Sequence, residues 1–207
     1  MSHNIPPYSH EEELRELSFQ YLIDGHQFSQ QAGVLLADGE LMRQCQYHVG
    51  YLSKISVTLY MAIECSLKSM ICIAHIGEPP HTVYWKRIRP AGHSFTKLLK
   101  EIPDFATQVS DTSLDAELKR LTSAEISERY CLEISSESDL LGNINIDDAK
   151  LEEKVKEAND LHLTARSLRQ KVWDLRKVAF EGRRTLPPHL VKEVLQRIKS
   201  KVADQTN

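Results

Sequence analysis

The chain of 207 residues carries a formal charge of −3, and its 41% hydrophobic and 27% charged residues are ordinary for a globular protein. We expect no membrane-spanning helix, because Glu64, Lys68 and His75 interrupt the longest apolar segment and no run of about 18 uncharged apolar residues remains. The polar, acidic N-terminus lacks the pattern of a secretory signal, which favours a cytoplasmic protein.

Two helices are expected in the N-terminal part of the chain. Ser9 followed by Glu12 fits a capping box, in which each side chain accepts from the other residue's backbone N–H, so a helix should begin near His10. The Asp-Gly pair that ends at Gly25 is typical of a helix stop or a kink. A second helix is then expected over residues 26–37, with apolar side chains along one side.

A long apolar helix is expected over residues 41–76, where apolar side chains recur every three or four positions and Gly50 can bend the axis. The glycine and prolines that follow predict a helix stop and then a loop over residues 79–91. Gly92 and the two residues after it open a second amphipathic helix, which ends near Ile102.

The clearest helical periodicity lies toward the C-terminus. A helix is expected over residues 148–180, where the apolar positions are spaced by three and four residues, as in a heptad seam. Such a seam packs along another helix, either within the chain or from a second copy. A helix over residues 114–134 precedes it, and a last helix begins near Pro187. The seam consists of Leu151, Val155, Ala158, Leu161, Ala165, Leu168, Val172, Leu175 and Ala179.

Because no alternating apolar pattern of strand length occurs, the sequence predicts an all-α fold: an up-and-down helical bundle with a helical C-terminal extension. We divide it into an N-terminal helix (1–25), the bundle (26–134), an acidic linker (135–147) and the extension (148–207). From residue 151 onward, 13 Lys and Arg against 8 Asp and Glu give a charge of +5, which leaves −8 for the rest. This basic part fits either a solvated helix surface or a surface for nucleic acid or an acidic partner.

Three short motifs follow one another in a distinctive order. Glu64 and Lys68 lie four residues apart on the apolar helix, a Gly-His pair at His93 opens a Leu-rich helix, and an Arg-Tyr pair begins at Arg129. In this order the motifs resemble the HEPN superfamily, the small helical "higher eukaryote and prokaryote nucleotide-binding" domains. The resemblance covers about half of the chain, residues 31–133.

The resemblance implies an up-and-down bundle that often pairs as a homodimer, that binds nucleotide or RNA, and that acts in host defence or a toxin–antitoxin setting. Two places depart from the family's pattern. Ser94 and Phe95 stand where the family has an acidic residue and a leucine after the histidine, and Cys131 stands where a proline often follows the Arg-Tyr pair.

The expected loop carries the densest cluster of basic and aromatic residues in the chain, namely Tyr84, Trp85, Lys86, Arg87 and Arg89. Such a cluster can bind phosphate while Trp85 stacks on a base. Alternatively, the aromatic side chains attach a surface loop to the core.

Other candidate residues also have two interpretations. The pair of Glu64 and Lys68 stabilises a helix by about 0.3–0.5 kcal/mol, or Lys68 meets phosphate beside a groove. His93 lies at a helix start, where the helix dipole disfavours its protonation, and it contacts a ligand or caps the helix. Arg129 and Tyr130 reach phosphate and a base, or pack within the bundle. The predicted ligand-binding residues are Glu64, Lys68, Arg87, Arg89, His93, Arg129 and Tyr130.

Many HEPN proteins are metal-independent ribonucleases with an Arg-x(4–6)-His motif, in which the histidine moves a proton and the arginine offsets charge on the phosphorus. No such pair lies on the helix after Arg129 and Tyr130, where one is most expected, so we expect a binding module without a catalytic residue, and a ribonuclease is the alternative. Whether the protein is an enzyme stays open. The pairs with suitable spacing are Arg43/His48, Arg87/His93, Arg183/His189 and Arg184/His189.

Neither a metal ion nor another cofactor is predicted. No spacing of Cys, His and Asp suggests zinc, and the chain has no Gly-rich phosphate loop and no nucleophile elbow. The four cysteines form no C-x-x-C pair and are expected to be reduced and packed. A third hypothesis is a structural module that binds a protein partner through the seam of residues 148–180.

Overall fold

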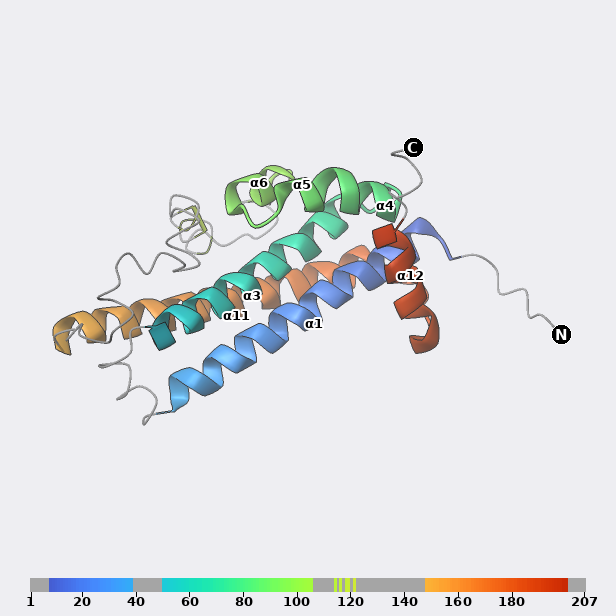
Figure 1. The fold of residues 1–207 in the computed structure, drawn as a ribbon. Helices are drawn as coiled ribbons and strands as arrows, with labels where there is room; N and C mark the ends of the chain where they lie inside the picture. The colour runs from blue at the N-terminus through green and yellow to red at the C-terminus, as the bar shows by residue number, and fades with distance from the viewer. Residues whose placement is uncertain are drawn as a thin grey trace.

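Three long helices lie side by side and form the body of the protein (Figure 1). The computed structural model describes residues 8–38, 50–105 and 148–200, together with residues 114, 116, 118, 119 and 121. One long helix runs in the direction opposite to the other two (Figure 1). In chain order, the three helices are α1 (His10–Ala37), α3 (Gly50–Ala74) and α11 (Asp148–Ala179).

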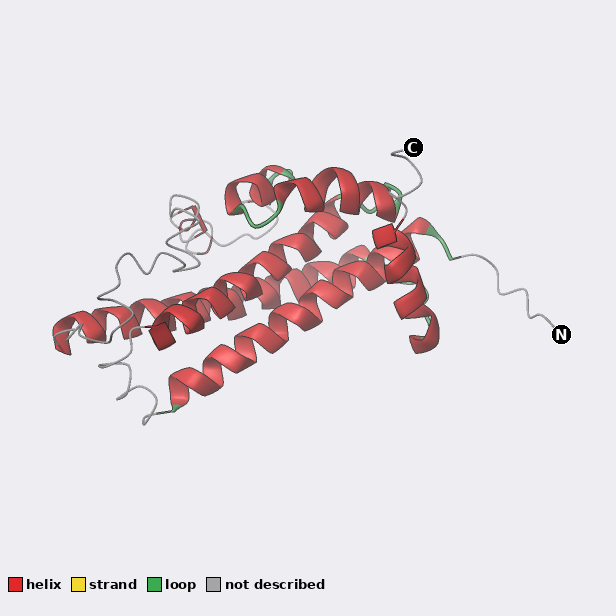
Figure 2. Cartoon of the chain, in the orientation of Figure 1, coloured by secondary structure: helices red, strands yellow, loops and turns green. Residues whose placement is uncertain are grey.

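Shorter helices cover one side and one end of these three (Figure 1). Four consecutive segments follow α3 and lie over its C-terminal part, while the last helix contacts the beginning of α1. Every regular element of the described residues is a helix, so the predicted all-α bundle is confirmed (Figure 2). The short elements are α4 (Pro80–Thr82), the π-helix η1 (Val83–Ile88), α5 (Arg89–Ala91), α6 (Phe95–Lys100) and α12 (Pro188–Ser200).

One apolar core joins the long helices. Leu17 of α1, Leu67 of α3 and Leu168 of α11 belong to the same buried cluster. Burying each such side chain contributes about 1.5–3 kcal/mol. The predicted seam of α11 therefore packs within the chain, against α3 and α1, and the C-terminal helix shares the core of the bundle. Its buried positions are Ala158, Leu161, Ala165, Leu168 and Val172.

The predicted break at Gly25 does not occur, because α1 continues without interruption from His10 to Ala37. Gly25 is buried where α1 packs closely against α3. A Cβ atom on Gly25 would lie 3.0 Å from the carbonyl oxygen of Ala62 and 3.1 Å from Cβ of Cys65. The glycine therefore serves helix packing instead of ending the helix, and a local sequence pattern does not distinguish these roles.

The predicted loop over residues 79–91 is also wrong, since this segment is helical from Pro80 to Ala91. Pro79 is the N-cap and Pro80 the first residue of α4, where a missing N–H removes no hydrogen bond, whereas Pro90 lies near the end of the continuous helical run from α4 through η1 to α5. Gly92, with a φ of +58°, ends the segment in a conformation that disfavours other residues. Pro79 and Pro80, which we interpreted as helix breakers, thus stand at the beginning of a helical segment.

The beginning of α1 is held by ion pairs to the C-terminal part of the chain. The predicted capping box of Ser9 and Glu12 is confirmed, and Glu12 also lies 2.6 Å from Nε of Arg184. Glu13 pairs with Arg197 of α12 in the same way. Hydrogen bonds from Arg184 lower the pKa of Glu12 from 4.5 to about 2, which outweighs the opposing effect of burial. Buried carboxylates are tolerated here because each has a cationic partner.

Among the described helices, α3 alone is long and apolar enough to cross a membrane, over Lys54–Ala74. In the most apolar stretch of 18 residues within this segment, 61% is buried inside the protein. Its apolar side chains pack against α1 and α11, as those of a core helix do.

Candidate functional site

A buried carboxylate on α3 brings together three of the predicted site residues. Oε1 of Glu64 lies 2.5 Å from Nζ of Lys68, one turn further along α3. Its other oxygen, Oε2, lies 2.8 Å from Nδ1 of His93, which is distant in the sequence. We call these three residues the Glu64 site. Glu64 is only 5% exposed, so both neighbours compensate for the cost of burying its charge.

The turn between α5 and α6 places His93 over this carboxylate. The positive φ of Gly92 reverses the chain, and the hydroxyl of Ser94 accepts from the N–H of Lys97 and caps α6. The side chain of His93 is 63% exposed, whereas that of Glu64 is 7% exposed. The carboxylate thus orients an imidazole that meets solvent, an arrangement suited to binding an anion or to moving a proton.

The side chain of Lys68 is mostly buried, whereas a lysine that binds phosphate needs an exposed ammonium group. Its side chain is 15% exposed, and its ammonium lies 6.0 Å from the centre of the Tyr21 ring in addition to its ion pair with Glu64. This geometry agrees with the structural interpretation of the Glu64–Lys68 pair. Lys68 supplies a positive charge beside Glu64 and so stabilises the carboxylate that contacts His93.

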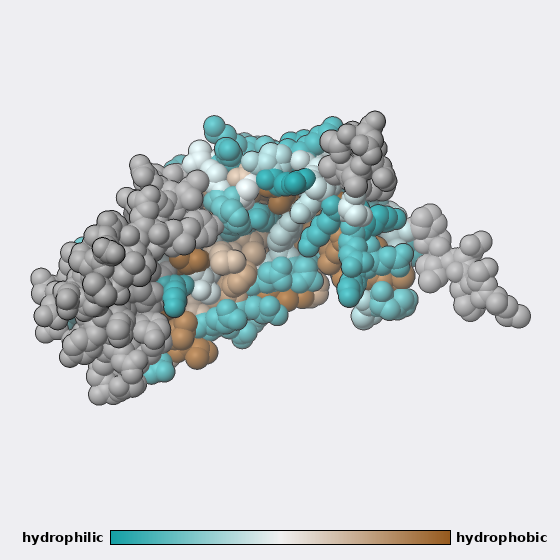
Figure 3. Space-filling view, in the orientation of Figure 1, coloured by the Kyte–Doolittle hydropathy of each residue, from teal (hydrophilic) through white to brown (hydrophobic). Residues whose placement is uncertain are grey.

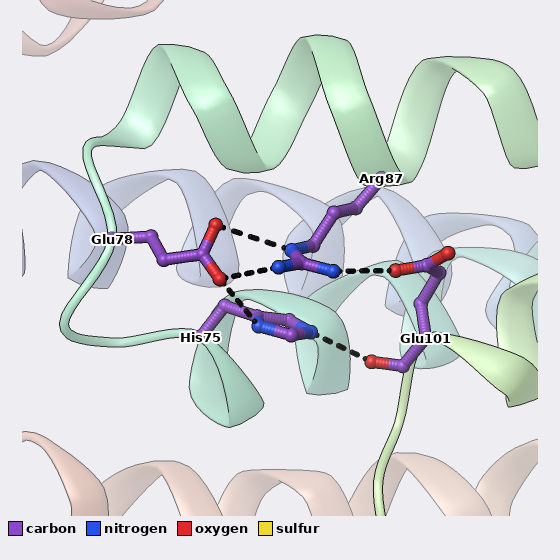
Figure 4. Close-up of polar contacts among 4 residues, drawn as sticks. All are labelled: His75, Glu78, Arg87 and Glu101. Carbon is purple, nitrogen blue, oxygen red and sulfur yellow. Dashed lines mark hydrogen bonds and ion pairs between the residues drawn. The ribbon is translucent and has the colours of Figure 1, made fainter.

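Arg87 belongs to a second polar cluster, in which it binds Glu78 and Glu101 (Figure 4). Its guanidinium donates two hydrogen bonds to Glu78, at 3.2 and 2.5 Å, and one to Glu101 at 3.0 Å. These bonds lower the pKa of Glu78 and raise that of Arg87. Arg87 therefore joins η1 to the ends of α3 and α6, and its charge is balanced by two carboxylates.

His75 completes this cluster, and the sequence analysis did not assign it a role (Figure 4). Its Nδ1 lies 3.0 Å from the carboxylate of Glu78, and its Nε2 lies 2.8 Å from the backbone oxygen of Glu101. A carbonyl and a carboxylate only accept, so both contacts are hydrogen bonds together when each ring nitrogen carries a proton. The spacing of three residues between His75 and Glu78 was the signal available in the sequence.

The aromatic residues of η1 attach this layer to its neighbours. Nε1 of Trp85 donates to the backbone oxygen of Ile198 in α12, at 3.0 Å. Tyr84 packs edge-on against Trp85, with ring centres 5.2 Å apart, and the guanidinium of Arg89 lies 4.0 Å from the centre of the Trp85 ring. Trp85 is thus engaged within the protein, as in the structural interpretation, while Arg89 is exposed above it.

Four cations on the outer layer have no acidic partner within ion-pair distance among the described residues. Lys86 and Arg89 are exposed at η1 and α5, and Lys97 and Lys100 are exposed one turn apart on α6. Residues 81–100 contain five Lys and Arg and no Asp or Glu. We call these four residues the cationic surface. Hydrophilic side chains dominate the visible edge of this layer (Figure 3).

The remaining candidates divide into two groups. Arg129, Tyr130 and the pair Arg43/His48 lie outside the described residues. The other Arg-x(4–6)-His pairs do not come together through any contact that we observe. Arg87 binds the glutamates of its own cluster while His93 binds Glu64, and Arg183 and Arg184 pair with Glu11 and Glu12.

No group of three or more His, Cys, Asp and Glu side chains within the described residues could hold a metal ion. Comparison of the chain with protein-family models, with curated proteins and with solved structures returns no match. The fold and the site therefore define a class only: an all-α bundle with a carboxylate-supported histidine beside an exposed cationic surface.

Proposed function

We propose that this protein is a nucleotide- or RNA-binding module, in which His93, Arg89 and the other residues of the cationic surface contact phosphate. The observation that supports this most is the presence of four exposed cations without acidic partners beside an exposed, carboxylate-supported imidazole. Cations paired within a protein have little charge left for a ligand, whereas these four keep theirs.

The proposal assigns different roles to the residues predicted from the sequence. Arg89 and His93 contact the ligand directly. Glu64 and Lys68 orient His93 from below, and Arg87 holds η1 in place. An arginine stacked on an indole keeps its planar donors available at the edge, so Arg89 suits phosphate or a base. Pairing of two copies, as the HEPN resemblance implies, would present two such surfaces.

Binding of a labelled single-stranded RNA, followed by fluorescence anisotropy, tests the proposal. Replacing Lys97 and Lys100 by Glu should weaken binding by about 10-fold or more and lower the salt dependence, since each lost phosphate contact removes about 0.7 from the slope of log K against log salt. The matched control replaces Lys156 and Lys177 of α11 by Glu, which changes the net charge equally on another helix.

An equal loss of affinity in both variants would mean that only net charge matters, and the proposed surface would be wrong. The same conclusion follows if neither RNA nor mononucleotides bind the wild-type protein at about 50 mM salt, where such contacts are strongest. A mononucleotide competitor separates the two ligands, because displacement of the RNA by the mononucleotide indicates a compact phosphate site.

A metal-independent ribonuclease is a second candidate, and one contact favours it. The hydrogen bond between Glu64 and Nδ1 of His93 is the arrangement that orients a histidine for proton transfer. If the protein cleaves RNA in the presence of EDTA, His93→Ala should slow cleavage by about 10²–10⁴-fold. Binding without any cleavage at high protein concentration would leave the binding module as the function.

A further inference from the structure

An open groove lies between the C-terminal half of α1 and the middle of α11, on a part of the protein that the proposed function does not use. It has a volume of about 1110 Å³, and one residue of α3, Thr58, also borders it. A volume of this order holds a small organic molecule, because ligand sites commonly measure about 300–1,000 Å³.

The ionised side chains on the described border of this groove are both cationic. Arg166 and Arg169 lie on this border together with His26 and His162, and none of the described residues that line the groove is Asp or Glu. Arg166 and Arg169 lie three residues apart on α11, so they project from the same face, and neither has an ion-pair partner in the described ranges. A groove that concentrates positive charge between low-dielectric walls attracts an anion.

Arg169 has an unmet hydrogen-bonding requirement. Its Nε is buried and has no hydrogen-bond partner within the part of the chain that the structure describes. A buried charged donor without a partner is unfavourable. An oxyanion in the groove would accept from the other N–H groups of this guanidinium.

His162 contributes a polar wall that depends on a glycine. A Cβ atom on Gly33 would lie 2.9 Å from Cε1 of His162, so the glycine leaves room for the imidazole in its present position against α1. Burial and the nearby charge of Arg166 lower the pKa of His162, and its ring also hydrogen-bonds the backbone of Ser29. Val34, which is 70% exposed, borders the same groove and supplies apolar surface.

We propose that the α1–α11 groove binds a small organic anion with at least two negative charges, in which the charged group lies between Arg166 and Arg169 and an apolar part contacts Val34. Guanidinium groups bind phosphate and carboxylate oxygens in pairs, and both kinds of anion satisfy this geometry. The groove is formed by other helices than the cationic surface, so it is independent of the proposed function.

Isothermal titration of the full chain with phenyl phosphate, tripolyphosphate and citrate at constant ionic strength tests the proposal. Saturable binding of at least one probe is expected. Replacing Arg166 and Arg169 by Gln should weaken that binding by about 10-fold or more. Equal replacement of Lys156 and Lys177 on α11 should leave it unchanged. Phosphate and carboxylate ligands are distinguished by whether tripolyphosphate or citrate binds more tightly.

Gln30→Glu provides a second variant that does not disturb the core, because Gln30 is exposed at the border of the groove. Its added negative charge should also weaken binding of the anion. Absence of saturable binding at about 1 mM of every probe overturns the proposal. The proposal is also overturned if both Gln30→Glu and the arginine variant bind the probe as tightly as the wild-type protein does. An equal loss of affinity in the lysine control would overturn it as well. Replacing Lys97 and Lys100 by Glu should not change binding of the anion in the groove. A failure of the groove proposal can therefore be distinguished from a failure of the proposed function.

Discussion

Gly25→Ala tests whether α1 and α3 approach each other as closely as the structure indicates. In an isolated helix, this substitution is favourable by about 0.5–1 kcal/mol, because alanine loses less backbone entropy than glycine on folding. In this protein the added methyl group would lie 3.0 Å from the carbonyl oxygen of Ala62 and 3.1 Å from Cβ of Cys65. The first of these atoms belongs to the backbone of α3, which cannot move without displacing the helix.

Overpacking of this kind costs about 1–3 kcal/mol, which exceeds the gain in helix propensity. We therefore expect Gly25→Ala to lower the free energy of unfolding by about 1 kcal/mol. Urea denaturation followed by far-UV circular dichroism measures this change, and the midpoint should fall while the slope stays constant.

Gly33→Ala is the matched control, since it makes the same change in the same helix. Its nearest neighbour would be Cε1 of His162, at 2.9 Å. This atom ends a side chain that can rotate, so the cost should be smaller and the free energy of unfolding should stay within about 0.5 kcal/mol of the wild-type value. If Gly25→Ala proves as stable as Gly33→Ala, the close approach of α1 and α3 is incorrect.

Three further predictions concern the core and the N-terminal ion pairs. The folded-state pKa of Glu12 is about 2, below its ordinary 4.5, so its ion pair stabilises the protein above pH 4.5 and this contribution is lost as the pH falls toward 2. Glu12→Gln should therefore make the free energy of unfolding depend less on pH over this range, as measured by urea unfolding at a series of acid pH values. Leu168→Ala should lower the free energy of unfolding by about 2–5 kcal/mol in the same assay, whereas Leu163→Ala, at a position 62% exposed on the same helix, should lower it by about 0.5 kcal/mol or less. Equal losses in the two variants would contradict the packing of α11. The hydroxyls of Ser18 and Ser69 are buried and lie 2.8 Å apart, so Ser18→Ala should lower the free energy of unfolding by about 1–2 kcal/mol. Replacing both serines by Ala should cost less than the two single replacements added together, and additive losses in this double-mutant cycle would indicate that the hydrogen bond is absent.

The sequence alone was sufficient for the helical class and for several helix boundaries. Ser9 and Glu12 predicted the beginning of α1, because a capping box depends on residues only three apart, and Gly92 with the two residues after it predicted the beginning of α6. The heptad-like spacing predicted which face of α11 would be buried, since helical periodicity determines which side chains share a face.

Tertiary structure decided how the ambiguous residues are used. Gly25 is compatible with a helix end or with a close helix contact, and only the position of α3 selects the second. Pro79 and Pro80 fit a loop as well as the beginning of a helix, and packing of η1 against α3 and α12 favours the helix.

The candidate sites depended on contacts between residues far apart in the chain. The sequence singled out Glu64, Lys68 and His93 as unusual, but the contact of His93 with Glu64 spans 29 residues and arises from the turn at Gly92. The groove beside Arg166 gave no local signal at all, because it forms where α1 and α11 pack and neither helix is unusual by itself. Local patterns thus determined the helices, whereas their packing determined which charges are compensated and which remain available to a ligand.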